Sequence, residues 1–231
     1  MNITILTTDT IHHRFFISKI NEFRKIGSIF LERRIIEPKY DNKSPFEEQE
    51  KEYEQKNFDF KDEYPKCPLF EFESMNDKNA FSQMKNVNPE LGIVFGTGKL
   101  NDHVIESFPL LMNVHRGIPE YYRGIDSDLW AIKNKDYENI GTTIHEVESD
   151  LDTGKIIAQE YLKLEKNMKV HHIRYHTTLI AVNLCIEAID KFSRGKLELR
   201  PQKNKGEYFS FMCSKLKKKM EYQFNSHCSN L

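Results

Sequence analysis

The chain of 231 residues lacks several features that mark particular classes of protein. Its four cysteines form no Cys-x-x-Cys pair and show no spacing typical of metal ligands, so we expect reduced thiols and no bound metal. It has no excess of one charge, because 34 lysine and arginine residues face 35 aspartate and glutamate residues. With a formal net charge of −1, the chain offers no general electrostatic basis for binding nucleic acid or an acidic membrane.

Long apolar segments are also absent. No run is long enough to span a bilayer, and the first residues lack the basic region followed by an apolar region that a secretory signal has. We therefore expect a cytoplasmic protein. The length suits one large α/β domain or one domain with a substantial tail, and two domains are also possible.

A glycine-rich phosphate loop is missing as well, although the chain begins as a β-loop-α unit. Residues 2–7 are typical of a short strand and residues 11–23 of a helix, with capping side chains between them. In open α/β sheets, ligands bind at the loop that follows such a strand. This loop has no Gly-x-x-Gly, but His12, His13 and Arg14 stand at the start of the helix, where anions are favoured. These three side chains either contact a diphosphate or pack the helix.

Strand and helix patterns alternate through the rest of the chain, which predicts an α/β fold with a mainly parallel central sheet. We place this domain at residues 1–194 and a C-terminal extension at residues 195–231. Residues 37–65 are charged and aromatic, which indicates an insertion that is either packed over a cleft or solvated. In the extension, aromatic residues at 208–211 are expected to pack and the lysines at 215–219 to face solvent. Further strands are predicted at residues 28–33, 68–72, 89–95, 110–115, 140–147 and 155–164, and further helices at residues 46–55, 78–85, 125–133 and 168–194.

The most informative stretch is residues 110–119, an apolar strand that runs into a Gly/Pro turn. The two-residue period of a strand places Asn113 and His115 on one face at its C-terminal end. Residues 147–154 form an acidic loop closing on glycine, which can carry a carboxylate back over that end. Asp152 is the carboxylate that we expect there. An isolated Asn-x-His would equally suit a strand end with two satisfied polar groups.

Together these residues resemble the folate-dependent formyltransferases. The likeness rests on Asn-Val-His at 113–115, Pro-Glu-Tyr-Tyr-Arg-Gly at 119–124 and Asp-Leu-Asp-Thr-Gly at 150–154. It implies a Rossmann-like formyltransferase domain, N10-formyltetrahydrofolate as the co-substrate and no metal. The catalytic Asn, His and Asp of that family correspond to Asn113, His115 and Asp152.

The three residue types suit formyl transfer chemically. The acceptor amine must lose a proton as it attacks, and a free histidine, with a pKa of about 6.5, can take it. An asparagine amide can donate a hydrogen bond to the carbonyl oxygen as that oxygen gains negative charge, and loss of such a donor costs on the order of 10²–10³ in rate. The aspartate can orient the histidine, support its protonated form or hold a water, and the sequence does not rank these roles.

The resemblance also implies where the two substrates bind. The Gly-Thr-Gly loop after residues 89–95 corresponds to the part of the family's pocket that hydrogen-bonds the pterin edge through backbone groups, with a plain strand-to-helix turn as the alternative. Its glycine spacing does not match a dinucleotide fingerprint. The folate-binding candidates are Gly96, Thr97, Gly98, Lys99, Glu148 and Asp150, and the candidates for a sugar nucleotide are His12, His13, Arg14, Arg116, Tyr122, Arg123 and Trp130.

The acceptor is the least defined part of this prediction. The missing phosphate loop disfavours glycinamide ribonucleotide, and the neutral charge and short C-terminal region disfavour an initiator tRNA. The motifs look most like those of bacterial sugar-nucleotide N-formyltransferases. This implies a homodimer acting on a nucleotide-linked amino-dideoxy sugar, first of all dTDP-4-amino-4,6-dideoxyglucose, for O-antigen and lipopolysaccharide biosynthesis. A glycinamide ribonucleotide formyltransferase, a formyltetrahydrofolate hydrolase and a non-catalytic folate- or nucleotide-binding module remain alternatives.

Overall fold

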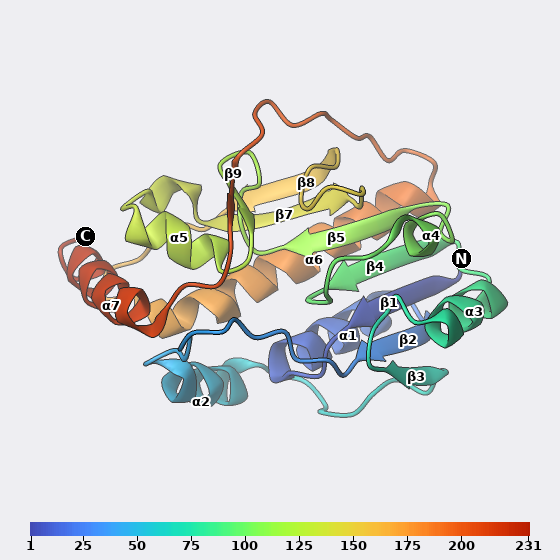
Figure 1. Cartoon of the computed structure of the whole chain (residues 1–231), viewed down its shortest axis with the longest axis horizontal. Coiled ribbons are helices and arrows are strands. Elements are labelled where there is room, and N and C mark those ends of the chain that lie inside the picture. Colours follow the sequence, from blue (N-terminus) through green and yellow to red (C-terminus); the bar gives the residue numbers. More distant parts are fainter.

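A seven-stranded sheet forms the centre of the computed structural model, which describes all residues from 1 to 231 (Figure 1). Its strands lie in the order β3-β2-β1-β4-β5-β7-β8, and the first five of them run parallel. β7 then pairs antiparallel with β5, and β8 antiparallel with β7. The predicted α/β fold with a mainly parallel sheet is confirmed. The strands are β1 (Ile3–Thr7), β2 (Ile26–Glu32), β3 (Leu69–Phe72), β4 (Leu91–Phe95), β5 (Leu111–His115), β7 (Gly141–Glu146) and β8 (Ile156–Tyr161).

Helices cover both faces of this sheet, which is why β1 and β4 are buried along their whole length (Figure 1). On one face, α1 (Ile11–Phe23) and α6 (Ile173–Ser193) share a core of 23 buried residues with the strands. On the other face, α3 (Lys78–Val87) and the short α4 (Asp102–Ile105) build a core of 10 residues. Neither α6 nor any other helix is both long and apolar enough to cross a membrane.

The predicted helix over residues 168–194 starts later than expected. A 3-10 turn at Val170–His172 precedes α6, which ends at Ser193, close to the predicted domain boundary at residue 194. The helix α4 had no counterpart among the predicted elements. It is four residues long, and so short a segment carries too few apolar positions to show a helical period.

The C-terminal extension corrects one prediction, the solvent-facing lysine run at residues 215–219. These residues belong to a helix, α7 (Ser214–Ser229), whose inner face lies in a third core with α5 (Ser127–Lys133). Met220, Phe224 and Cys228 recur every four residues and are fully buried there. Lys217 lies on the same face and is 7% exposed, with its Nζ 3.2 Å from a carboxylate oxygen of Asp126. The other lysines of the run are exposed, as the sequence predicted.

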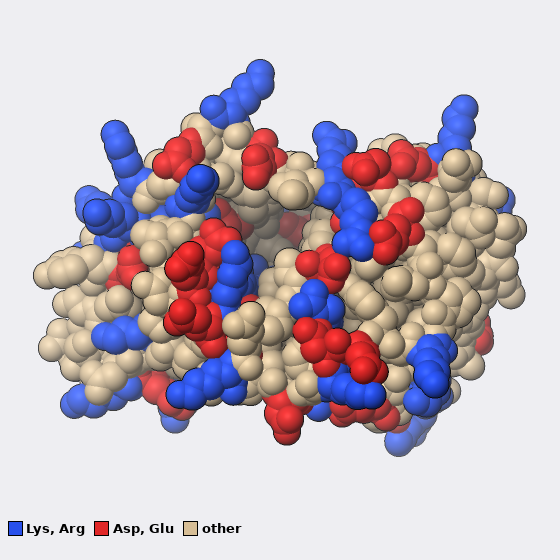
Figure 2. Space-filling model, turned by 90° about the horizontal axis from the view of Figure 1, so that it is seen from below, with Lys and Arg blue, Asp and Glu red and all other residues tan.

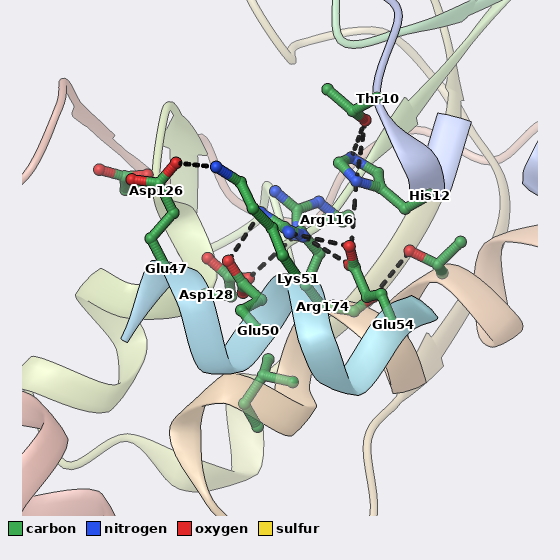
Figure 3. Close-up of polar contacts among 12 residues, drawn as sticks. Thr10, His12, Glu47, Glu50, Lys51, Glu54, Arg116, Asp126, Asp128 and Arg174 are labelled. Atoms are coloured by element: carbon green, nitrogen blue, oxygen red, sulfur yellow. Dashed lines mark hydrogen bonds and ion pairs between the residues drawn. The ribbon is translucent and has the colours of Figure 1, made fainter. Parts of the chain in front are cut away.

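The insertion at residues 37–65 forms the helix α2 (Glu47–Asn57), which packs on α6 through charged side chains. Its buried residues are Glu50 and Glu54, and both carboxylates pair with Arg174 of α6 (Figure 3). The bond to Glu54 uses both oxygens, at 2.6 and 2.8 Å. The helix is therefore neither free in solvent nor held by an apolar face, since its inner side is a buried ion cluster.

Candidate active site

A cavity of about 720 Å³ opens at the carboxyl ends of β1, β4 and β5, where an open α/β sheet is expected to bind ligands. A space-filling view shows a hollow in this part of the molecule with acidic and basic side chains along its rim (Figure 2). The loops after these strands supply one wall, and the segment 33–36 and residues Tyr208 and Phe211 complete the opening. The cavity therefore joins the sheet, the start of the insertion and the C-terminal extension.

The structure brings Asn113, His115 and Asp152 together at the floor of this cavity. The Nδ1 atom of His115 is 3.6 Å from Oδ2 of Asp152, and the Asn113 amide nitrogen is 3.4 Å from Oδ1 of the same carboxylate. The Nε2 atom of His115 lies 3.0 Å from the Tyr122 carbonyl oxygen, which can only accept. The Nε2 atom therefore carries the proton of the neutral ring, and Nδ1 is left to take up another.

A fourth polar side chain, His145, belongs to the same cluster and was not foreseen from the sequence. It lies opposite Asn113 in the β5–β7 pairing, and its Nε2 is 3.1 Å from the Asn113 amide nitrogen. Its Nδ1 lies 2.7 Å from the Glu146 carbonyl oxygen, so Nδ1 is protonated and Nε2 accepts from Asn113. This arrangement sets the direction of the Asn113 amide group. The only signal in the sequence was a histidine near the end of a strand followed by the acidic loop.

Asp152 is held as a carboxylate in a constrained loop. Burial alone would raise the pKa of Asp152, but His115 and His145, when either ring carries a second proton, and the Gly124 N–H hold that pKa well below its usual value. The Gly124 N–H donates to Oδ2 at 2.7 Å. The backbone of Asp152 has a φ of +56°, which is uncommon for a residue other than glycine.

The C-terminal extension keeps the Asp152 loop in place through a second residue that the sequence did not reveal. The Gln202 amide donates to the carbonyl oxygens of Asp152 and Gly154, at 2.8 and 2.9 Å. Further along, β9 (Glu207–Phe209) pairs with β6 (Tyr122–Gly124), so the extension also braces the turn that contacts His115 (Figure 1).

The loop after β4 lines the cavity, as do most of the predicted folate-binding residues, Gly96, Thr97, Gly98, Lys99 and Glu148. Asp150 does not line it, and its carboxylate is instead 3.3 Å from Nζ of Lys205. The loop is fixed by Glu32 at the end of β2, whose carboxylate accepts the Gly98 N–H at 2.6 Å and the Met75 N–H at 3.1 Å. The Gly98 N–H is thus already bonded within the protein.

Glycine is required in this loop for two reasons. Gly96 has a φ of +84°, and a Cβ atom there would lie 2.6 Å from Nε2 of His13. At Gly98 a Cβ would lie 3.0 Å from the Cδ1 atom of Ile36, which covers the loop. The backbone of the loop is therefore packed closely against side chains from α1 and the segment after β2.

His12 and His13 line the cavity but are neutral, which corrects the expectation that they supply positive charge to a diphosphate. Burial, with Arg116 and Arg174 nearby, lowers the pKa of His13 to about 3. Burial and His13 lower the pKa of His12 well below its usual value. Both rings are bonded to the Thr10 hydroxyl, with the His13 ring also bonded to Thr8. They can exchange hydrogen bonds with a ligand but not neutralise it.

We expect acid to unfold the protein partly through His13. The folded pKa is lowered from 6.5 to about 3, so the unfolded chain binds the extra proton and stability is lost as the pH falls from about 6.5. At pH 5 one such group costs about 2 kcal/mol of the free energy of unfolding. Urea unfolding of His13→Gln at pH 7.5 and 5 should show a smaller loss on acidification than the native chain. The exposed His103→Gln is the control, and an unchanged loss in His13→Gln would contradict the assignment.

Four predicted ligand contacts, Arg14, Tyr122, Arg123 and Trp130, do not line the cavity. Each has a partner inside the protein. The Arg14 guanidinium pairs with Asp9 and Asp62, and the Tyr122 hydroxyl donates to Asp136. Arg123 donates to the Gly206 and Leu151 carbonyl oxygens and Trp130 to that of Ser210. Tyr122, Arg123 and Trp130 thus brace the turn around residues 119–130 and the extension, Arg14 ties α1 to the insertion, and we no longer assign any of the four to the ligand.

No group of three or more His, Cys, Asp or Glu side chains is placed to hold a metal ion. The basic side chains that do line the cavity are Arg33, Arg34, Lys99 and Arg116. Arg33 is engaged by Asp9 and Glu71, at 3.0 and 2.8 Å. Arg116 forms no hydrogen bond within the chain, although it lies next to His115 in the sequence, and it is therefore free to bind a ligand.

Comparisons with known proteins all identify formyltransferases. The family model described as formyl transferase matches residues 34–189. Methionyl-tRNA formyltransferase of Borreliella burgdorferi is 33% identical over 144 residues, which cover 62% of this chain and 45% of that protein. The corresponding protein of Thermodesulfovibrio yellowstonii is 30% identical over 137 residues, 58% of this chain and 44% of its own length. The chain thus spans less than half of these relatives.

Solved structures resemble the fold over most of the chain. A 4-N formyltransferase from Francisella tularensis superimposes with a TM-score of 0.62 at 20% identity, over 90% of this chain and 76% of that one. The formyltransferase PseJ from Anoxybacillus kamchatkensis superimposes with a TM-score of 0.58 at 20% identity, over 97% of this chain and 90% of that one. The latter was solved in complex with UDP-4,6-dideoxy-4-formamido-L-AltNAc and tetrahydrofolate.

Proposed function

The chain belongs to the formyl transferase family, and from this we propose that it transfers a formyl group from N10-formyltetrahydrofolate to the amino group of a nucleotide-linked amino-dideoxy sugar. The observation that carries the proposal is the cluster of Asn113, His115 and Asp152 on the floor of an open cavity. A proton acceptor and a hydrogen-bond donor, 3.6 and 3.4 Å from one buried carboxylate, meet the needs of acyl transfer to an amine.

The cavity has features that suit the formyl donor. Its volume of about 720 Å³ lies within the range of small-molecule sites. Near the Gly96–Gly98 loop it is lined by apolar side chains that can face a flat ring, namely Ile36, Val94, Leu100 and Val147. Polar groups of the loop stand beside them. We assign the pterin ring of N10-formyltetrahydrofolate to this end of the cavity.

Three side chains would carry out the transfer. The donor, when bound, supplies the formyl carbon and a tertiary nitrogen that leaves with a proton. His115 accepts the proton of the attacking amine at Nδ1 and is then an imidazolium ion held between the Tyr122 carbonyl and the Asp152 carboxylate. The same proton replaces the broken nitrogen–formyl bond, so the amine gains the formyl group and the folate nitrogen gains the proton.

Asn113 would stabilise the negative charge on the formyl oxygen. One amide hydrogen is given to His145, and the second faces Asp152 at 3.4 Å, a long and weak hydrogen bond. That second hydrogen can turn to the formyl oxygen at little cost. The role of Asp152 is then to favour the protonated form of His115 and to hold Asn113, rather than to react itself.

We expect Gln202 to matter for turnover through Asp152. Gln202→Leu removes two hydrogen bonds from a loop with an unfavourable backbone conformation, and we expect kcat to fall about 10-fold, equivalent to about 1.4 kcal/mol, with KM little changed. Steady-state kinetics with a fixed acceptor measure both constants. The exposed Gln49→Leu should leave them unchanged. A Gln202→Leu enzyme with native kcat would show that the loop is held without this contact.

The acceptor assignment rests on the basic side chains at the rim of the cavity. Arg34 and Lys99 line the cavity, and a guanidinium can hold phosphate oxygens in pairs. The two solved formyltransferases share the fold over nine tenths or more of this chain, and PseJ was solved with a UDP-linked formamido sugar. Within this class we propose dTDP-4-amino-4,6-dideoxyglucose as the acceptor, a role in O-antigen and lipopolysaccharide biosynthesis, and a homodimeric assembly.

The sequence relatives favour a second candidate, an acceptor amine on methionyl-tRNA. A net charge of −1 is poor for an RNA ligand, because phosphate contacts supply most of the affinity for nucleic acid. We therefore rank this candidate below the sugar nucleotide.

One panel of assays decides between these functions. The protein is incubated with N10-formyltetrahydrofolate and one acceptor at a time, and the formylated product is detected by its mass. We expect product with dTDP-linked or GDP-linked amino-dideoxy sugars, and calorimetric binding of dTDP or GDP below millimolar concentration. Product only with methionyl-tRNA or glycinamide ribonucleotide, or tetrahydrofolate release without any amine, would replace the proposal with the corresponding alternative.

A further inference from the structure

Two oppositely charged side chains stand together in the cavity beside the catalytic histidine. Arg116 directly follows β5, and Asp128 lies in the first turn of α5. Both line the cavity, and the closest approach of their charged groups, from an Arg116 terminal nitrogen to Oδ2 of Asp128, is 3.8 Å (Figure 3). That distance is too long for a hydrogen bond, so the two groups are neighbours without being bonded to each other.

Beyond their ion pair, the two side chains leave hydrogen-bonding sites unused, with Asp128 buried and the Arg116 side chain 28% exposed. Asp128 is 5% exposed; its Oδ1 accepts the N–H of the next residue, and its Oδ2 accepts no hydrogen bond from the chain. Burial raises the pKa of Asp128, against the opposing effect of Arg116. Arg116 has five N–H donors and uses none of them within the protein.

The neighbouring charged groups show that this lack of partners is local. Arg174 lies in the same region, yet it is bonded to Glu50 and Glu54 at 2.6–2.8 Å (Figure 3). Asp126, two residues before Asp128, accepts the Met212 N–H and pairs with the Lys217 ammonium. Among these neighbours, Arg116 and Asp128 are the two that keep unused hydrogen-bonding sites toward the cavity.

The chemistry of the pair selects the group that fits between them. A phosphate would suit Arg116 but be repelled by Asp128, and an ammonium would suit Asp128 but be repelled by Arg116. A hydroxyl group can donate its hydrogen to the carboxylate and accept one from the guanidinium at the same time. A single hydroxyl oxygen, or two on adjacent carbons, can bridge groups about 4 Å apart, because each hydrogen bond spans about 2.7–3.0 Å.

The position of the pair relative to His115 indicates which hydroxyl of the acceptor it would bind. A Cβ atom on Gly117 would lie 2.6 Å from Nε2 of His115 and 2.7 Å from Cβ of Ser127, so the start of α5 stands directly against the His115 ring. Asp128 follows Ser127, and Arg116 follows His115. A group held by the pair therefore lies in the same cavity as His115 and near the ring that takes up the proton of the amine.

We propose that Arg116 and Asp128 form a subsite for a hydroxyl group on the carbon next to the acceptor amine, which makes the acceptor a 1,2-amino alcohol. This rests on the proposed function and narrows it. Amino-dideoxy sugars with a free hydroxyl beside the amine belong to this class. The amine of methionyl-tRNA and that of glycinamide ribonucleotide do not, because the carbon next to each carries no hydroxyl.

The test compares two acceptors that differ by this hydroxyl alone, dTDP-4-amino-4,6-dideoxyglucose and its 3-deoxy analogue, with the native enzyme. We expect kcat/KM to be higher for the hydroxylated acceptor by about 10² or more, because a site built to bond a hydroxyl rejects the analogue that lacks it. Equal kcat/KM values would overturn the subsite and leave the proposed function standing. Formylation of neither acceptor would overturn both.

Variants then assign the discrimination to the pair. Asp128→Leu and Arg116→Gln should each bring the ratio of the two kcat/KM values to within about threefold of one. They should do so chiefly by lowering kcat/KM for the hydroxylated acceptor. If the two residues serve folding alone, each variant would lower kcat/KM for both acceptors by the same factor. The ratio of the two kcat/KM values would then stay at its native value, which would contradict the proposal. Asp59→Asn, an exposed aspartate with no hydrogen bond in the chain, is the control and should keep the native ratio. If either variant fails to fold, the native comparison still decides.

Discussion

His115→Ala is expected to lower kcat for formyl transfer by about 10² or more while the protein stays folded. His115 is 6% exposed, and its Nδ1 lies 3.6 Å from Asp152 at the cavity floor. Its removal takes away the proton acceptor and leaves the Asp152 carboxylate without this neighbour. The loss should appear in kcat rather than in KM, because the imidazole acts as the amine attacks and not while the acceptor binds. Single-turnover formylation at saturating acceptor measures it directly.

Two controls separate this role from a structural one. Added imidazole should restore part of the rate in His115→Ala, since the vacated space adjoins the cavity, and should do nothing for Asn113→Ala. Thermal unfolding followed by circular dichroism reports whether the variant is intact. An unfolded His115→Ala, or a folded one with near-native kcat, would mean that the histidine serves packing and that another group accepts the proton.

Arg174→Met is expected to destabilise the protein by about 3–5 kcal/mol, since it leaves two buried carboxylates without their partner. Glu54 is fully buried and Glu50 nearly so, and Arg174 bonds both. Burial already raises the pKa of Glu50 to about 7 even with Arg174 present. Without the guanidinium, the insertion helix should detach from α6 before the sheet unfolds. Urea unfolding at pH 7.5 gives the free energy, and hydrogen exchange in α2 gives the local effect.

The residue that follows α6 supplies a matched control. Arg194 pairs with Asp190 one turn away at 2.9 Å and is 64% exposed, so Arg194→Met should cost no more than about 1 kcal/mol. The triple variant Arg174→Met, Glu50→Met, Glu54→Met should recover much of the lost stability, because no unpaired charge stays buried. Equal losses for Arg174→Met and Arg194→Met would show that the cluster is solvated enough to tolerate an open charge.

Residue type and local spacing were enough to find the centre of the site. Asn113 and His115 could be assigned to one face of a strand because the period of two is a property of the backbone. The turn that returns Asp152 could be predicted from its acidic residues and its closing glycine. The β-α alternation gave most elements of the sheet for the same reason, since each strand and helix is specified within its own few residues.

Local spacing could not say which polar groups are already engaged. Arg14 and Trp130 were assigned to a ligand by residue type, yet their partners Asp62 and Ser210 lie 48 and 80 positions away in the chain. Lys217 looked solvated because it stands in a run of lysines, and it is buried because α7 packs on α5. In each case a long polar side chain bonded to the group that folding brought nearest.

The sequence by itself determined most strands and helices of the main domain, the face that carries Asn113 and His115, and the loop that returns Asp152, because these depend on backbone period and turn chemistry over a few residues. Only the tertiary structure decided that His145 orients the Asn113 amide and that Gln202 holds the Asp152 loop. It also decided that Arg116 and Asp128 keep unused hydrogen-bonding sites facing the cavity. Those outcomes depend on strand register and on contacts between segments that are distant in the chain. A polar group that is hydrogen-bonded within the protein is no longer available to bind a ligand.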